Sequence, residues 1–243
     1  MNFRSLALFV SAVLALGAAS HLPAQATLTL SATTGRFTYP QTFTSSSTLP
    51  TGWFAYTGSG QDAGISTTPL PLSSTTNASS TGAFLFHPSS TSTDYAFGTS
   101  VEKGDLTTRN YFGVAILNNT GKTLADIRIT GNSEVYGNGN ASAFSDFANV
   151  GFGASYSTVS WTAVPSLNLS QVQSLSAALS ASWAPGATLW LRWEDYNGSA
   201  ANHRDFAIDD LTVTAVPEPS TYAMLLGLST LGLVWFRRCS ARQ

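Results

Sequence analysis

An apolar run near each end of the chain confines any folded domain to the sequence between the two runs. The first run, residues 6–19, follows a single basic residue and leads to a small-residue site made of Ala24, Gln25 and Ala26. A basic start, a short apolar stretch and an Ala-x-Ala site are the layout of a secretory signal peptide. We therefore predict that residues 1–26 are a signal peptide cleaved after Ala26. The alternative is an uncleaved anchor, but this run is shorter than the ~20 residues that span a bilayer.

The second apolar run, residues 222–236, lies between a proline-rich segment and a basic end. The flanking residues are Pro217, Glu218 and Pro219 before the run, and Arg237 and Arg238 after it. Two prolines fix φ and remove two backbone donors, so the segment is predicted to be extended and to stay out of any sheet. As a helix, the run would rise about 22 Å, which makes it a short and mismatched anchor for a hydrocarbon core of ~30 Å. The positive-inside rule keeps the arginines cytoplasmic and places the body outside the inner membrane.

This order of parts at residues 216–242 resembles the PEP-CTERM family of sorting tails. The resemblance implies that residues 216–243 are a sorting tail, with the motif at 217–219, a hydrophobic helix at 222–236 and a basic end at 237–242. It also implies recognition and cutting by exosortase, a membrane-embedded cysteine protease of bacteria that make extracellular polysaccharide. The protein would pass from an inner-membrane precursor to the cell surface or the extracellular matrix. The alternative is an ordinary tail anchor.

The body between these segments, residues 27–215, has a charge balance that excludes one class of partner. It carries seven basic and twelve acidic residues, a net charge of −5. Without a basic patch to neutralise phosphates, nucleic-acid binding is not expected. The only cysteine of the chain, Cys239, lies in the tail, so the body has neither a disulfide nor thiol chemistry. Its stability must come from the burial of apolar side chains.

Short segments rich in β-branched and aromatic residues recur along the body between Gly-, Asn- and Ser-rich turns, which predicts an all-β fold. In residues 124–130, Ala125, Ile127 and Ile129 alternate with charged residues, as in a half-buried antiparallel strand. We predict an antiparallel two-sheet β-sandwich, jelly-roll-like, flanked by the signal helix and the C-terminal hydrophobic helix. The predicted strands are residues 51–56, 82–86, 111–118, 124–130, 150–155, 188–194 and 206–215. Its predicted core includes Leu117, Ile127, Ile129, Leu191, Trp193, Leu211 and Val213.

Three further segments are assigned from local chemistry. The turn residues 118–121 separate two strong strands and predict a β-hairpin. Residues 171–181 are rich in Ala and Leu, but serines alternate with the apolar residues, which favours a strand over a helix. The Ser- and Thr-rich stretches 42–51 and 66–81 predict solvated surface loops, with O-linked glycosylation as the alternative.

The acidic residues near the end of the body are the main candidates for a site there. They are Glu194, Asp195, Asp205, Asp209 and Asp210, with the more distant Glu134. One interpretation is structural, with Arg192 and Arg204 pairing the carboxylates. The alternation of apolar residues also shifts by one position at Asp209 and Asp210, which indicates a β-bulge there. A second interpretation is a Ca²⁺ site or a sugar contact at Asp195, Asp205, Asp209 and Asp210, because carboxylate oxygens are suitable Ca²⁺ ligands. No other cofactor is expected. A third is a carboxylate pair for glycoside hydrolysis.

The same part of the sequence is similar to another group of domains. Trp193 and Asp195 followed by Ala207, Ile208, Asp209 and Asp210 resemble the last strand of MAM- and laminin-G-like sandwiches. Residues 111–113 with 117–121 look like the central hairpin of such bodies. The resemblance supports the fold rather than a function.

No catalytic motif is found, so no enzymatic activity is expected from the body. We predict an exported surface or matrix protein with a structural or matrix-associated role, whose partners are exosortase and extracellular polysaccharide. The alternative is a carbohydrate-binding module that stacks sugars on exposed rings of Trp53, Trp183 or Trp190. A divergent glycosidase is a further alternative.

Overall fold

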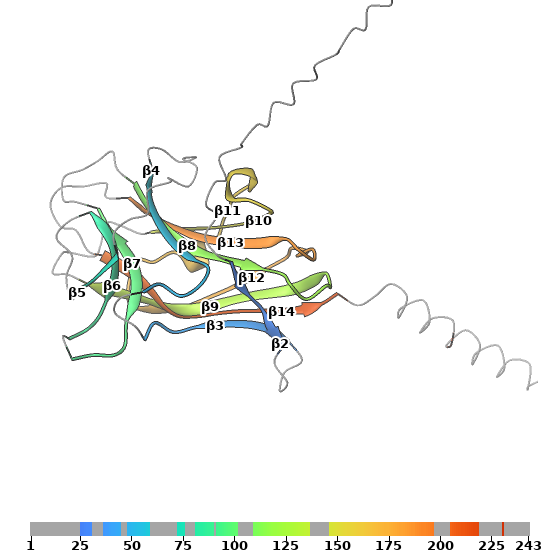
Figure 1. Cartoon of the computed structure of the whole chain (residues 1–243), viewed down its shortest axis with the longest axis horizontal. Helices are drawn as coiled ribbons and strands as arrows, with labels where there is room; N and C mark the ends of the chain where they lie inside the picture. Colours follow the sequence, from blue (N-terminus) through green and yellow to red (C-terminus); the bar gives the residue numbers. More distant parts are fainter. Residues whose placement is uncertain are drawn as a thin grey trace, which may run out of the picture.

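The computed structural model describes residues 25–30, 36–44, 48–58, 72–75, 81–89, 91–101, 109–136, 146–196, 205–218 and 230. Within them, strands form two sheets that face each other across a shared core (Figure 1). This confirms the predicted antiparallel β-sandwich, although two short edge strands pair in parallel with their neighbours. The predicted terminal helices lie outside the described residues, apart from Gln25, Ala26 and Thr230.

The first sheet has six strands in the order β1-β8-β13-β10-β11, and β4 also pairs with β8. Its strands are β1 (Ala26–Thr27), β4 (Trp53–Gly58), β8 (Arg109–Leu117), β10 (Phe147–Gly153), β11 (Thr162–Ala163) and β13 (Thr188–Tyr196). Two 3₁₀ turns, Tyr156–Thr158 and Pro165–Leu167, flank β11. The central strands β8 and β13 are apolar on both faces, because a second cluster of rings covers the outer face of this sheet.

The second sheet has eight strands in the order β12-β9-β14-β7-β6-β5, and β3 pairs with both β14 and β2. Its strands are β2 (Thr29–Leu30), β3 (Phe37–Gln41), β5 (Leu72–Thr75), β6 (Gly82–Phe86), β7 (Ala96–Ser100), β9 (Leu124–Tyr136), β12 (Gln173–Leu179) and β14 (Asp205–Pro217). Strand β12 confirms the strand predicted within residues 171–181. The two longest strands, β9 and β14, lie side by side at the centre of the sheet.

The core between the sheets contains six of the seven side chains that the sequence places there. These are Ile127, Ile129, Leu191, Trp193, Leu211 and Val213, none more than 1% exposed. The prediction for Leu117 is wrong, because this residue is only half-buried. In β8 it alternates with Phe112, Val114 and Ile116, which fill the core, so its side chain lies on the outer face.

The bulge predicted at the two aspartates is confirmed. The pairing of β14 with β9 shifts between Asp209 and Thr212, so that Asp210 and Leu211 lie opposite the single residue Gly131. Asp210 takes a left-handed backbone conformation with φ of 50°. The extra residue resets the phase, so that Phe206 and Ile208 before the bulge and Leu211 and Val213 after it all face the core.

The predicted hairpin at residues 118–121 is wrong. Strand β8 belongs to the six-stranded sheet and β9 to the eight-stranded one, so the turn carries the chain across the sandwich. Asn118 is fully buried there, and its side-chain amide donates to the backbone oxygens of Lys122 and Trp183. Its carbonyl oxygen accepts bonds from the N–H and the hydroxyl of Thr120. The same turn chemistry therefore closes a corner between sheets instead of joining paired strands.

Candidate functional site

The Pro-Glu-Pro segment begins inside the last strand of the sandwich. Val216 pairs with Ala125 and Pro217 with Leu124, and the Glu218 N–H donates to the Thr123 oxygen at 3.0 Å. The prediction that the proline-rich segment stays out of the sheet is therefore wrong for Val216 and Pro217, the last two residues of β14. Pro219 and the two topology residues Arg237 and Arg238 lie outside the described residues.

Proline is tolerated at this position because of where its missing donor would point. Glu218 donates toward β9, so the backbone nitrogen of the preceding residue, Pro217, points to the opposite side of β14. On that side the pairing with β3 runs only as far as Ala215, opposite Phe37. No backbone acceptor of β3 is left unpaired by the proline, which is the edge position where a strand accepts this residue.

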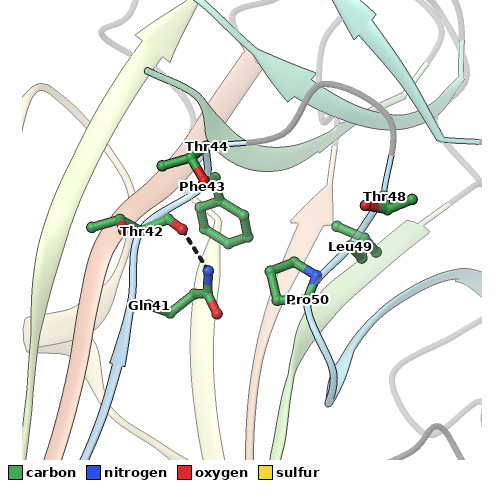
Figure 2. Close-up of a pocket in the computed structure, with 7 residues that line it drawn as sticks. All are labelled: Gln41, Thr42, Phe43, Thr44, Thr48, Leu49 and Pro50. Atoms are coloured by element: carbon green, nitrogen blue, oxygen red, sulfur yellow. Dashed lines mark hydrogen bonds between the residues drawn. The ribbon is translucent and has the colours of Figure 1, made fainter. Parts of the chain in front are cut away.

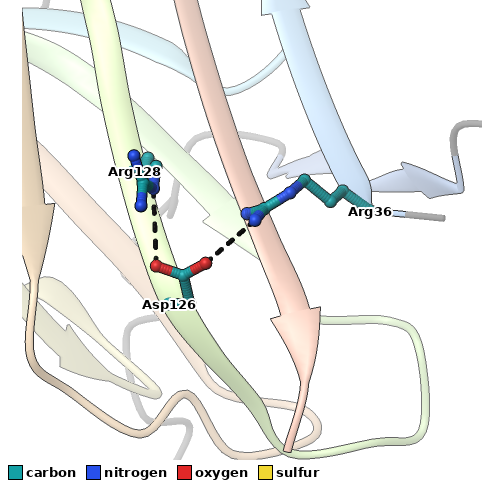
Figure 3. Close-up of polar contacts among 3 residues, drawn as sticks. All are labelled: Arg36, Asp126 and Arg128. Carbon is teal, nitrogen blue, oxygen red and sulfur yellow. Dashed lines mark hydrogen bonds and ion pairs between the residues drawn. The ribbon is translucent and has the colours of Figure 1, made fainter. Parts of the chain in front are cut away.

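A small ionic group lies beside this end of β14 (Figure 3). Asp126 accepts from Arg36 at 3.0 Å and from Arg128 at 3.4 Å. It sits in a second bulge, where the pairing shifts between Thr214 and Val216, and its φ of 46° is left-handed. The hydrogen bond from Arg36 is the main cause that lowers the pKa of the Asp126 carboxyl. All three side chains are partly exposed, so these ion pairs add little to the stability of the protein.

Buried carboxyl groups gather at the opposite end of the sandwich, and only some of them are those expected from the sequence. Asp195 and Asp205 lie there with Glu194, and each is less than 10% exposed. The fourth member, Asp146, stands just before β10, where no pattern in the sequence points to it. A bridge to Leu169 brings it into place. Asp209 and Asp210, which the sequence analysis grouped with them, lie at the β14 bulge instead.

The carboxyl groups of this end are held by different partners. Arg109 pairs with Glu194, and the Thr99 hydroxyl donates to Asp195 at 3.0 Å. One carboxyl oxygen of Asp146 is buried with no hydrogen-bond partner among the described residues. Burial, together with the charges of its three acidic neighbours, raises the pKa of Asp146 well above its ordinary value. A carboxyl in this position is most stable with its proton on.

We expect the stability of the protein to fall as the pH rises above about 4, the ordinary pKa of an aspartate. The folded state holds the Asp146 proton more tightly than the unfolded chain, so its stabilising effect is present below the unfolded pKa and is lost through the folded one. Burial also raises the pKa of Asp209 to about 6, which acts in the same direction. Asp146→Asn should melt several degrees higher than wild type at pH 7, and its melting temperature should fall less steeply as the pH rises.

Melting temperature followed against pH for the wild type and Asp146→Asn checks this expectation. Glu218→Gln is a matched control, because that carboxyl is exposed and lies at the far end of β14 from Asp146 and Asp209. Equal pH slopes in wild type and Asp146→Asn would contradict the assignment. A rise in melting temperature on addition of Ca²⁺ would instead show that the carboxylates are ionised and share a cation. In the part of the chain that the structure describes, no three His, Cys, Asp or Glu side chains are grouped to hold a metal ion.

The outer face of the six-stranded sheet carries an aromatic cluster that surrounds Arg192. Phe54, Tyr56, Tyr111 and Trp190 project from β4, β8 and β13, and Tyr156 and Trp161 cover them from the segment between β10 and β11. The Arg192 guanidinium lies 4.0 Å from the centre of the Trp161 ring and donates to the Tyr156 hydroxyl at 2.6 Å. The arginine is only 3% exposed, so this cluster stabilises the cation by stacking and hydrogen bonding.

The three tryptophans considered as sugar platforms are all buried. Trp53 is 5% exposed, and Trp183 and Trp190 are fully buried. Their indole N–H groups bond within the protein, to Tyr39, Ala187 and Gly153 respectively. These rings present no face on which a sugar could stack.

A small cavity lies between β3 and the start of β4 (Figure 2). Its volume is about 140 Å³, and it is lined by Gln41, Thr42, Phe43, Thr44, Thr48, Leu49 and Pro50. The Gln41 side-chain amide closes one side by donating to the Thr42 oxygen at 2.6 Å. These lining residues include no titratable group, so the cavity offers no acid, base or nucleophile.

A sandwich whose last strand runs into a Pro-Glu-Pro segment, followed in sequence by an apolar run and two arginines, is the architecture of an exported protein with a sorting signal. Residues 215–238 match the family described as the PEP-CTERM protein-sorting motif. The chain therefore carries a PEP-CTERM sorting motif behind a β-sandwich body. Such a motif indicates an exported protein whose membrane-anchored precursor awaits processing by exosortase, a membrane enzyme. Among the described residues, no helix is long and apolar enough to cross a membrane.

Comparisons of the whole chain found distant similarities in shape. The CBM22-1 xylan-binding domain of Paenibacillus barcinonensis Xyn10C is 9% identical, with a TM-score of 0.37, over 74% of this chain and 95% of that one. The enzymatically active domain of tailspike protein 4 from bacteriophage CBA120 is 11% identical, with a TM-score of 0.35, over 68% of this chain and 19% of that one. The CBM22-1–GH10 modules of Clostridium thermocellum Xyn10B are 14% identical, with a TM-score of 0.33, over 75% of this chain and 28% of that one. A search of curated proteins found no match.

Proposed function

We propose that this chain is held at the inner membrane by its tail, cut by an exosortase-type protease and delivered to the cell surface or the extracellular matrix. There the sandwich has a structural or matrix-associated role, without catalysis. The observation that carries the proposal is the match of residues 215–238 to the sorting motif, which begins in the last three residues of β14. The motif thus lies at the C-terminal end of a folded body, where a protease can reach it after export.

The intact mass and location of the protein, in cells with and without exosortase, test this proposal. With the enzyme, the protein should lose the residues after its motif and leave the inner membrane. Without the enzyme, it should remain there at full tail length, because only the protease releases it. Identical masses and identical fractionation in both strains would overturn the proposal.

A carbohydrate-binding role for the same body is the second candidate. Its support is a different aromatic surface, since the Phe147 side chain is 50% exposed at the start of β10 and Trp161 is partly exposed beside Arg192. Sugars stack on exposed aromatic faces, so these two rings offer the contact that the buried tryptophans do not. Retention of the mature protein by an extracellular polysaccharide favours this role, and free passage favours a purely structural one.

A further inference from the structure

The distance between the sandwich and the predicted membrane segment is set by very few residues. Glu218 still bonds to Thr123 of the body, and the apolar run begins at residue 222. Even a fully extended chain covers no more than about 14 Å over four residues. If the apolar run is inserted in the membrane, this end of the sandwich must therefore lie at the level of the lipid headgroups.

The surface at this end, here called the motif end, holds most of the described positive charge. Three of the five described Lys and Arg residues lie there, namely Arg36, Lys122 and Arg128. Arg36 precedes β3, whose first residue lies opposite Ala215, and Arg128 lies opposite Thr214. Lys122 is exposed and precedes Thr123, the residue that accepts from Glu218.

An exposed apolar side chain belongs to the same surface. Leu30 is 62% exposed and pairs with Phe37, which lies opposite Ala215 of β14. Arg128 is 61% exposed at its side chain, so both residues are open to solvent near this end of the sandwich. A leucine beside basic groups is the combination that enters the interface of an anionic bilayer.

The acidic residues of the motif end reduce this charge but do not reverse it. Asp126 binds Arg36 and Arg128 together, so the group of three keeps one net positive charge (Figure 3). Lys122 adds a second, and Glu218 removes one. At the opposite end, the carboxylates of Glu194, Asp195 and Asp205 outnumber Arg109, the one described Lys or Arg there. Among the described residues, charge is thus graded along the sandwich, from an acidic end to a weakly basic motif end.

We propose that the motif end docks on anionic lipid headgroups and holds the sandwich upright, with its acidic end away from the membrane. This inference rests on the proposed insertion of the tail. Docking fixes the position of the Pro-Glu-Pro segment at the membrane surface, where a membrane protease works. Each basic residue close to an anionic surface favours the docked state roughly fivefold.

The full chain in lipid vesicles tests the proposal. Cys239→Ser first removes the only cysteine. Asn119→Cys then places a fluorescent probe on the exposed turn of the motif end, and Val172→Cys places one beside the opposite end of β12. A quencher attached to lipid headgroups reports which probe lies near the membrane. Vesicles of phosphatidylcholine are compared with vesicles that also contain phosphatidylglycerol.

We expect strong quenching at Asn119→Cys in phosphatidylglycerol vesicles, less in phosphatidylcholine alone, and little at Val172→Cys in either. Lys122→Gln with Arg128→Gln should lower the ratio of docked to undocked protein roughly 25-fold, which is fivefold for each charge removed. The matched control, Gln171→Glu with Ser174→Glu, adds the same negative charge near the other end of β12 and should leave quenching unchanged. A concentration of 1 M salt should act like the charge removal, because it screens exposed charges.

Two failures are distinguishable. If the protein does not float with the vesicles, the tail is not inserted and the proposed function itself fails. If the protein floats with the vesicles, but the two probes are quenched alike or independently of phosphatidylglycerol, the tail anchors the protein and the docking proposal is wrong.

Discussion

Replacement of Pro217-Glu218-Pro219 by three alanines should leave the protein in the inner membrane at full length, while the wild type loses the residues after its motif. The apolar run 222–236 and the two arginines that set insertion and orientation are unchanged in this variant. The fold should survive as well, because residue 218 bonds to Thr123 through its backbone N–H, which alanine retains. The change therefore removes the segment that a protease would recognise and keeps the segment that inserts in the membrane.

Membrane fractionation and intact mass of both proteins check this expectation. Glu218→Ala alone is the matched control, because it removes the charge and keeps both prolines. If the triple variant is shortened and released as the wild type is, the segment is not the protease signal. If neither protein is shortened, the tail is a permanent anchor and the sorting interpretation fails.

Trp193→Ala should cost about 3–5 kcal/mol of unfolding free energy, which is the expected loss for a large ring removed from a packed core. Trp193 is fully buried, stacks on Phe112 with ring centres 5.4 Å apart and donates from its indole N–H to the Leu167 oxygen at 2.8 Å. The variant leaves a cavity between the sheets and a backbone oxygen without its donor. Denaturant unfolding of the purified protein measures the loss.

Trp161→Ala provides a comparison of the same chemical change at a partly exposed ring. It should cost clearly less, because solvent already reaches this ring and no gap opens between the sheets. Equal costs at the two positions would show that the core is not centred on Trp193.

The sequence allowed the faces of the strands to be predicted, but not their partners. The alternation in residues 124–130 correctly placed Ile127 and Ile129 inside, and the phase slip at Asp209 correctly located a bulge. The turn at residues 118–121 was misassigned because Asn and Gly report a change of direction and say nothing of which sheet receives the next strand.

At the candidate site as well, local features could be predicted from the sequence but contacts between distant residues could not. Pro217 and Glu218 were recognised from local chemistry, yet their attachment to Thr123 depends on a register that only the folded sheet defines. Asp146 carries no periodic signal and reaches the other acidic residues through a single bridge to Leu169. Trp190 looked available for stacking because half of an alternating strand usually faces water, and here the segment around Tyr156 covers it.

The position of β14 has a mechanical consequence for a protein attached by its tail. The strand pairs with β9 along nearly its whole length and with β3 and β7 on its other side. Tension applied through the tail acts along the strand axis, so these hydrogen bonds are loaded in shear and must give way together. Force applied across the strand, perpendicular to its axis, would instead open one pair at a time. The sandwich thus resists extraction most strongly in the one direction in which its own attachment pulls.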